Sequence, residues 1–280
     1  MRPGGPCRHL SRLRVSLPYS LLLELALLGL CTGFLAGLLG IGGGMVMVPF
    51  ITIILSARDY PPQHVIKIAV ATSLATICFT SLSSVRAHHR HGAVLWRVVR
   101  YLAPGIVLGS LLGSQIAAAM PARVLGLIFA GFVAFSATQM FFNRKPQPQR
   151  TLPGASGLFG VGALIGAISS LVGAGGAFIS VPFMTWCNVR IHNAVATSAA
   201  LGFPIALAGT IGYALAGWRL PDMPPGTLGY VYWPAFLLLS AASMLTAPFG
   251  ARVAHRMEVA PLRRVFAGVL YVMAGYFILR

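Results

Sequence analysis

The chain has 280 residues, of which 57% are hydrophobic and only 9% are charged. A soluble domain carries about 25% charged residues, so this composition excludes an ordinary soluble protein and indicates an integral membrane protein. Lys and Arg number 21 against 4 Asp and Glu, and because the basic residues lie between apolar runs, loops facing anionic lipid explain them better than nucleic-acid binding does.

Residues 1–18 form a basic segment ahead of the first apolar run. A signal peptide also begins in this way, but the apolar stretch that follows is too long, contains Glu24 and has no small-x-small cleavage site. We therefore expect a retained basic N-terminal tail, followed by the first membrane segment.

Eight apolar segments follow in chain order, at residues 20–55, 66–85, 98–120, 122–142, 154–187, 194–216, 228–249 and 262–279. Segments of this length can span about 30 Å of hydrocarbon. Residues 143–153, NRKPQPQRTLP, are polar and proline-containing without helical periodicity, and so predict a linker. The sequence predicts an all-α polytopic membrane protein with a first transmembrane repeat at 19–142 and a second at 154–280.

The two halves carry matching motifs in the same order. These are IGGGMVMVPF (41–50) with AGGAFISVPF (174–183), AVATS (69–73) with AVATS (194–198), Pro104 with Pro234, and IFAG (128–131) with VFAG (265–268). Four ordered matches indicate an internal duplication. Duplicated halves around a site at the membrane midplane are typical of secondary transporters.

The first segment of each half is too long for a plain crossing, since 36 residues would form a helix of about 54 Å. Either a crossing helix is broken at the glycine cluster, which gives eight crossings and parallel repeats, or a re-entrant hairpin forms, which gives six crossings and inverted repeats. Lys and Arg divide 13 to 8 between the two sides in the first geometry, and 9 to 12 in the second. The stronger bias favours about eight transmembrane helices with both termini cytoplasmic.

The glycine clusters predict helix breaks at membrane depth, where non-helical backbone must line a cavity or pack against protein. A new helix N-terminus carries free N–H groups and partial positive charge, so two facing breaks would bind a small anion. The alternative is close helix packing, which suffices for isolated glycines such as Gly109 and Gly113. The proposed binding glycines are Gly42, Gly43, Gly44, Gly175 and Gly176, and the proposed helix-breaking prolines are Pro49 and Pro182.

Polar side chains at matched positions extend this candidate site. The AVATS motifs supply the hydroxyls of Thr72, Ser73, Thr197 and Ser198, which could donate to an anion or simply satisfy helix carbonyls. Lys67 and His192 precede the two threonines by five residues each and could attract anions. The alternative for both is an ordinary place at a helix end near the interface.

Other chemistry has little support. Glu24 is the only acidic residue in an apolar segment, which argues against cation selectivity. The HHRH stretch at 88–91 stands among arginines and is interpreted as a basic loop without a metal. No catalytic arrangement stands out, and Cys7, Cys31, Cys78 and Cys187 have no metal or redox spacing. We expect no enzyme activity, no metal and no cofactor.

The chain resembles the sulfite exporter TauE/SafE family of bacterial membrane permeases over about residues 20–280. The resemblance is carried by GFLAGLLGIGGGMVMVPF (33–50), GAISSLVGAGGAFISVPF (166–183), the two AVATS motifs and HGAVLWRVVRYLAPGIVLGSLLG (91–113). It implies a multi-pass inner-membrane transporter of about eight helices that moves sulfite, organosulfonates or related anions.

These observations favour a secondary transporter for small sulfur oxyanions, working by alternating access around the paired breaks. A passive anion channel is the nearest alternative, and a membrane enzyme or a thiol-handling assembly factor is a more distant one. The expected partners are the anionic substrate and the lipid bilayer, with homo-oligomerisation left open.

Overall fold

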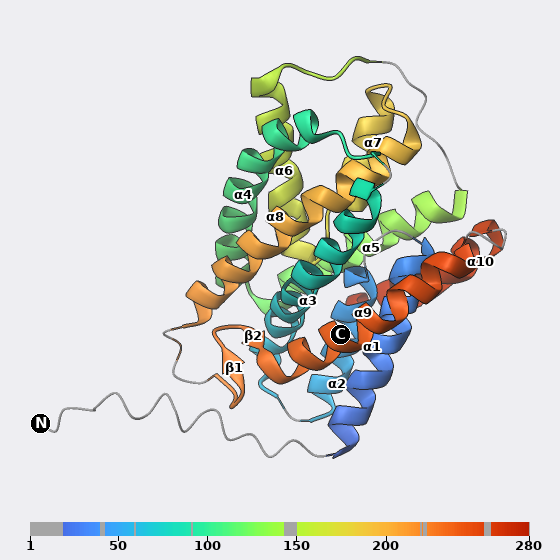
Figure 1. Cartoon of the computed structure of the whole chain (residues 1–280). Coiled ribbons are helices and arrows are strands. Elements are labelled where there is room, and N and C mark those ends of the chain that lie inside the picture. The colour runs from blue at the N-terminus through green and yellow to red at the C-terminus, as the bar shows by residue number, and fades with distance from the viewer. Residues whose placement is uncertain are drawn as a thin grey trace, which may run out of the picture.

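The computed structural model describes residues 19–39, 43–58, 60–90, 92–142, 150–218, 220, 223–254 and 259–279. The helices in these ranges are α1 (Tyr19–Leu39), α2 (Gly44–Ser56), α3 (Pro62–Arg90), α4 (Trp96–Ala119), α5 (Ala122–Phe142), α6 (Ala155–Val172), α7 (Ala177–Trp186), α8 (Ile191–Gly217), α9 (Trp233–Ala254) and α10 (Val259–Leu279). Figure 1 shows their arrangement. Six of the described helices, α1, α3, α4, α5, α6 and α8, are long and apolar enough to cross a membrane, which confirms an all-α polytopic membrane protein. The predicted tail at 1–18 and most of the linker lie outside the described residues.

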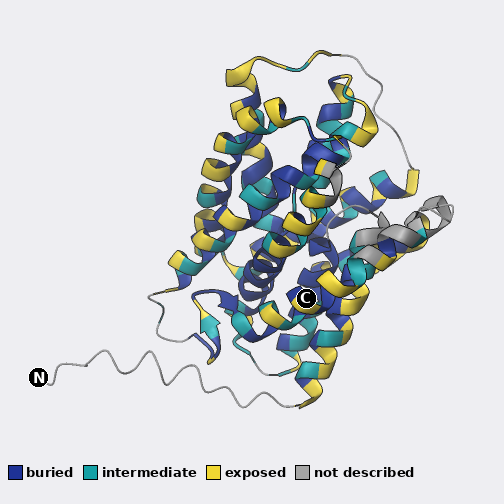
Figure 2. Ribbon diagram, in the orientation of Figure 1, coloured by how far each residue is buried: buried dark blue, intermediate teal, exposed yellow. Residues whose placement is uncertain are grey.

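Helices α3 and α8 form the centre of the molecule. The buried share of the membrane-length stretch is 78% in α3 and 61% in α8. In the outer helices α1 and α6 it is only 33% and 39%. A helix that is apolar all round belongs in a core, and small residues such as those of AVATS let neighbours pack closely. Figure 2 shows exposed residues concentrated on the outer helices.

Helices from opposite halves pack against each other, α4 on α6 and α1 on α9. Glycines make these contacts possible. A Cβ at Gly109 would overlap the carbonyl oxygen of Ala163, and one at Gly113 would lie 2.7 Å from the carbonyl oxygen of Ala167. The interpretation of these two glycines as packing residues is confirmed.

Helices α3 and α8 run antiparallel. A Cβ at Gly202 would lie 3.4 Å from Cβ of Ser81, whereas a Cβ at Gly209, further along α8, would lie 2.8 Å from Leu74, which is earlier in α3. Parallel repeats would require the two AVATS helices to run in the same direction. The preference for parallel repeats is therefore wrong.

The two overlong segments are helical hairpins. Arg58, just after α2, donates hydrogen bonds of 3.1 Å to Ser20 and to Glu24 at the start of α1. The backbone N–H of Arg150, ahead of α6, donates to the carbonyl of Trp186 at the end of α7 (3.3 Å), and its guanidinium lies 5.0 Å from the centre of the Trp186 ring. The two ends of each hairpin thus lie together, on the same side of the membrane.

This geometry contradicts the expected eight crossings, in which each first segment passes through the membrane. Helices α2 and α7 have 13 and 10 residues, about 20 and 15 Å, which is too short for a crossing. With hairpins the basic residues divide 9 to 12, so the charge bias that placed both termini in the cytoplasm becomes weaker and changes sign. The count failed because the side given to each basic residue depends on the number of crossings that is assumed, so the bias was no independent test of the topology.

Cysteine labelling tests this topology. In a variant lacking the native cysteines, Ser20→Cys and Arg58→Cys are expected to react with an impermeant maleimide from one side of the membrane, and Asn188→Cys from the other. Labelling of positions 20 and 58 from opposite sides would restore the crossing geometry. Total labelling after detergent solubilisation is the control for reactivity.

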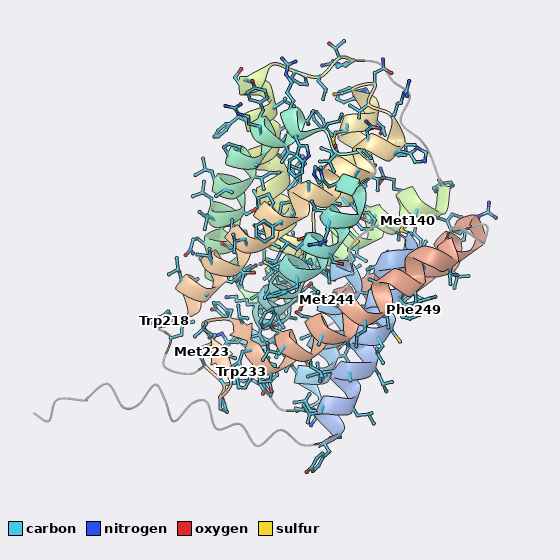
Figure 3. The ribbon with its side chains drawn as sticks, viewed as in Figure 1. Met140, Trp218, Met223, Trp233, Met244 and Phe249 are labelled. Carbon is cyan, nitrogen blue, oxygen red and sulfur yellow. The ribbon has the colours of Figure 1, made fainter. Side chains whose placement is uncertain are left out.

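Between α8 and α9 the chain forms a small antiparallel hairpin, β1 (Thr227–Leu228) paired with β2 (Val231–Tyr232). It closes the end of the molecule at which α8 stops and α9 starts. Trp218, Met223 and Trp233 gather at this end (Figure 3), and Met223 and Tyr232 are buried. The hairpin brings a backbone segment of the second half down onto α3.

Candidate functional site

Both glycine clusters lie in the bends between paired helices. Helix α1 ends at Leu39 and α2 begins at Gly44, with Gly43 as its N-cap. Helix α6 ends at Val172 with Gly173 as its C-cap, and α7 begins after its N-cap Gly176; the φ angles of these two residues, +70° and +76°, favour glycine. Gly42 lies outside the described residues.

The prolines do not break the helices. Pro49 lies inside α2 and Pro182 inside α7, each at the sixth helical position. Proline lacks the N–H that would bond four residues back, but there it disturbs only the first turns of a short helix. The prediction of Pro49 and Pro182 as break residues is wrong, and the interruptions belong to the glycines before them.

The two bends meet at the centre of the molecule. A Cβ at Gly44 would lie 2.5 Å from the carbonyl oxygen of Gly173. The hydroxyl of Ser73 donates to that same oxygen (3.0 Å) and lies 3.4 Å from the carbonyl oxygen of Gly44. The side chain of Ile77 is close to both clusters, 2.7 Å from a Cβ at Gly44 and 3.5 Å from one at Gly175.

This convergence has an electrostatic consequence. The first backbone bonds of α2 run from Val46 and Met47 to Gly43, and those of α7 from Ile179 and Ser180 to Gly176. The backbone N–H groups of the residues before these donors have no partner within the helix. They carry the partial positive charge of a helix start. Because α2 and α7 run from the centre to opposite ends, two positive helix ends approach each other. A negative ligand between them would relieve the repulsion.

The two AVATS threonines bind the opposite half in the same way. Thr72 accepts the backbone N–H of Tyr232 at 3.1 Å, and Thr197 accepts that of Leu95 at 3.0 Å. Both donors stand immediately before the tryptophan that starts a helix, α9 and α4 respectively. Both threonines are fully buried. They join the two halves instead of bonding to their own helices.

The serines lie closer to the bends. Ser73 bridges the two clusters as described, and Ser198 shares a hydrogen bond of 2.7 Å with Ser180 of α7. Ser180 also donates to the carbonyl of Gly176 (2.9 Å). The structure therefore brings Ser73 and Ser198 to the bends together with Gly43, Gly44, Gly175 and Gly176.

Lys67 and His192 do not share the site. They lie near the starts of the antiparallel helices α3 and α8, in the second and the first turn respectively, and so at opposite ends of the molecule. Lys67 is 8% exposed and donates a 2.6 Å hydrogen bond to the carbonyl of Ala118 in the last turn of α4. A lysine there satisfies a free carbonyl and the negative helix end. His192 is exposed.

The remaining reactive side chains lie in ordinary structural roles. Glu24 is held by Arg58, and His89 accepts a hydrogen bond of 3.2 Å from the indole of Trp96. Burial raises the pKa of the Cys187 thiol, against an opposing effect of Arg150. Among the described residues, no group of three His, Cys, Asp or Glu side chains could hold a metal ion.

Sequence reasoning missed two serines at the second bend, Ser180 and Ser169. Ser180 joins α7 to Ser198, and Ser169 lies on the last turn of α6 beside Gly176. Aligning the two halves position by position could have found both, because the first half has Met47 and Ala36 at the matching places.

Comparison with known proteins gives a consistent result. The family model described as "Sulfite exporter TauE/SafE" matches residues 25–277. A "Probable membrane transporter protein" of Haemophilus influenzae is 36% identical over 258 residues, covering 91% of this chain and 97% of the relative. The "Probable membrane transporter protein YdhB" of Bacillus subtilis is 29% identical, covering 71% and 79%, and a probable transporter of Methanocaldococcus jannaschii is 24% identical, covering 95% and 99%. No solved structure matches the chain.

Proposed function

Because the chain belongs to the sulfite exporter TauE/SafE family of membrane transporters, we propose that it carries small oxyanions, namely sulfite, organosulfonates or related sulfur oxyanions, across the bacterial inner membrane. The substrate class follows the family description. The anion binds between the two glycine bends, against the N-terminal ends of α2 and α7.

The observation that carries this proposal is the meeting of the two bends around Ser73. One hydroxyl contacts the carbonyl oxygens of Gly44 and Gly173, which sets the start of α2 next to the bend that leads into α7. Backbone N–H groups and hydroxyls are hydrogen-bond donors that suit an anion. Helix starts of discontinuous helices near the midplane are a recurring means of binding anionic groups in transporters.

The arrangement also supports alternating access between inverted repeats. Hairpins α1–α2 and α6–α7 enter from opposite sides, and α3 and α8 are antiparallel. The hydrogen bonds of the two threonines hold the halves together, Thr197–Leu95 toward one end of the molecule and Thr72–Tyr232 toward the other. We call these two hydrogen bonds latches. For one end to open, the latch at that end must break while the latch at the other end stays formed.

Removing one latch is expected to bias the transporter toward opening at that end. Thr72→Val and Thr197→Val each leave a buried N–H without an acceptor, which costs about 1–3 kcal/mol. Each variant should lower the melting temperature by several degrees and raise the cysteine accessibility of its own end only. The matched control is Thr52→Val, since Thr52 bonds only to Val48 of its own helix. Equal accessibility changes at both ends in either variant would contradict the latch assignment.

Counterflow in proteoliposomes tests the function itself. Vesicles preloaded with unlabelled sulfite should accumulate labelled sulfite in a saturable way, and thiosulfate, sulfate or a small sulfonate should compete according to substrate class. Flux that is linear in concentration and shows no counterflow would identify a passive anion channel. Absence of any sulfite movement through folded protein would overturn the proposal.

A further inference from the structure

The two bends differ chemically at one matched position. Aligning Pro49 with Pro182 gives an offset of 133 residues, which pairs Gly43 with Gly176 and Ala36 with Ser169. The pairing holds in space. The Cβ of Ala36 lies 3.5 Å from a Cβ built at Gly43, and the Oγ of Ser169 lies 3.2 Å from one built at Gly176. The first bend therefore has a methyl group where the second has a hydroxyl.

The hydroxyl of Ser169 is buried without a hydrogen-bond partner, and the residue is 1% exposed. Other buried hydroxyls, such as those of Thr32 and Thr52, donate to a carbonyl of their own helix. Leaving a buried donor unsatisfied is destabilising. Other buried hydroxyls of the described residues also have no hydrogen-bond partner, namely those of Ser56, Ser136, Thr210, Tyr232 and Ser240, but none of them is among the nearest atoms to a bend glycine.

The backbone holds Ser169 in place beside the start of α7. Its carbonyl accepts the N–H of Ala174 at 3.1 Å and closes the last turn of α6. The left-handed conformation of Gly176 then directs the chain into α7. The hydroxyl therefore lies beside the glycine from which α7 starts, and the free N–H groups of that helix start follow directly in the chain.

We propose that Ser169 donates a hydrogen bond to an oxygen of the bound anion, which makes the α7 end the tighter of the two anion subsites. This inference rests on the proposed function and deepens it. The donors available here are the Ser169 hydroxyl and the N–H groups at the start of α7, and such donors suit an oxyanion with several acceptor oxygens. Ala36 gives the α2 end no such donor.

An apolar side chain covers this subsite in the present conformation. The terminal methyl of Ile205 contacts the position of a Cβ at Gly176, and Ile165 lies 3.4 Å from it. The end of an isoleucine side chain can move by a rotamer change. Binding of the oxyanion therefore displaces the tip of Ile205 and pairs the Ser169 hydroxyl in the same step.

Sulfite counterflow with three variants tests the inference. Ser169→Ala is expected to raise the half-saturating sulfite concentration about tenfold or more, because a hydrogen bond to a charged group is lost. Ser169→Cys keeps a weak donor of similar size, so its half-saturating concentration should lie between those of the unmodified protein and Ser169→Ala. Ser170→Ala is the matched control, since Ser170 donates to Ala167 of its own helix, and it should change the value less than about twofold.

The outcomes separate this inference from the proposed function. Saturable counterflow by the unmodified protein, with unchanged half-saturation in folded Ser169→Ala and Ser169→Cys, would overturn the role of Ser169 and leave the transporter proposal standing. An equal rise in Ser170→Ala would also overturn it, because local packing would then be the cause. Absence of counterflow by the unmodified protein would overturn the proposed function, and this inference with it. Melting curves establish that each variant is folded.

Discussion

A Gly44→Val variant is expected to lose sulfite exchange to the background of empty vesicles. Any Cβ at this position would lie 2.5 Å from the carbonyl oxygen of Gly173 and 2.7 Å from Ile77, so the branched side chain forces the two bends apart. Each hydrogen bond to a charged group contributes about 1.5–3 kcal/mol, or about 10- to 100-fold in binding. Separating the two donor sets loses several of them at once.

The control for this variant is Gly131→Val, on the open face of α5, where a new Cβ meets no atom within 4 Å. It should exchange sulfite at the unmodified rate. Both variants are to be compared at equal reconstituted amounts, with size-exclusion profiles and melting curves as measures of folding. Retention of more than about a tenth of the exchange rate by folded Gly44→Val would contradict a site between the bends, because losing a single such bond already costs tenfold.

A Gly109→Leu variant is expected to fail at assembly instead of transport. The backbone of α4 lies directly against that of α6 at this point, so a Cβ would overlap the carbonyl of Ala163. Such overpacking costs about 3 kcal/mol, at the upper end of the usual range, and the contact joins the two halves. We expect little monodisperse protein after solubilisation and a melting temperature lowered by several degrees.

Gly160→Leu provides the matched control on α6. Gly160 is exposed and a Cβ there has open space, so leucine should be accepted at the lipid-facing surface with unchanged yield. Normal assembly of Gly109→Leu would show that the interface between α4 and α6 is not held as closely as the glycine contacts indicate. Loss of yield in both variants would point to a general intolerance of leucine.

Much of the candidate site could be predicted from the sequence, because its motifs occur twice in the same order. The glycine clusters and the AVATS motifs stood out as matched pairs, and the structure places Gly44, Gly175, Ser73 and Ser198 at the bends. Their hydrogen-bond partners could not be predicted. Thr72 and Thr197 bond to residues of the other half, and such contacts depend on how the halves interlock, which no local pattern encodes.

The topology was the main error, and its cause is physical. The proline motifs and the length of the first segments suit a broken crossing helix as well as a hairpin, and the charge count that decided between them rests on a weak preference. The pair Lys67 and His192 failed for the same reason. Matched positions of inverted repeats lie at opposite ends when they fall near a helix terminus, and together only near the centre.

The most direct test of the site is hydrogen exchange of the unmodified protein with and without saturating sulfite. If the anion binds between the bends, backbone amides in peptides covering Gly44–Val46 and Ala177–Ile179 should exchange more slowly when sulfite is present, while peptides from α5 stay unchanged. Protection should follow the sulfite concentration that half-saturates counterflow. Unchanged exchange in both bend peptides, at a concentration that saturates counterflow, would contradict binding at the paired helix starts.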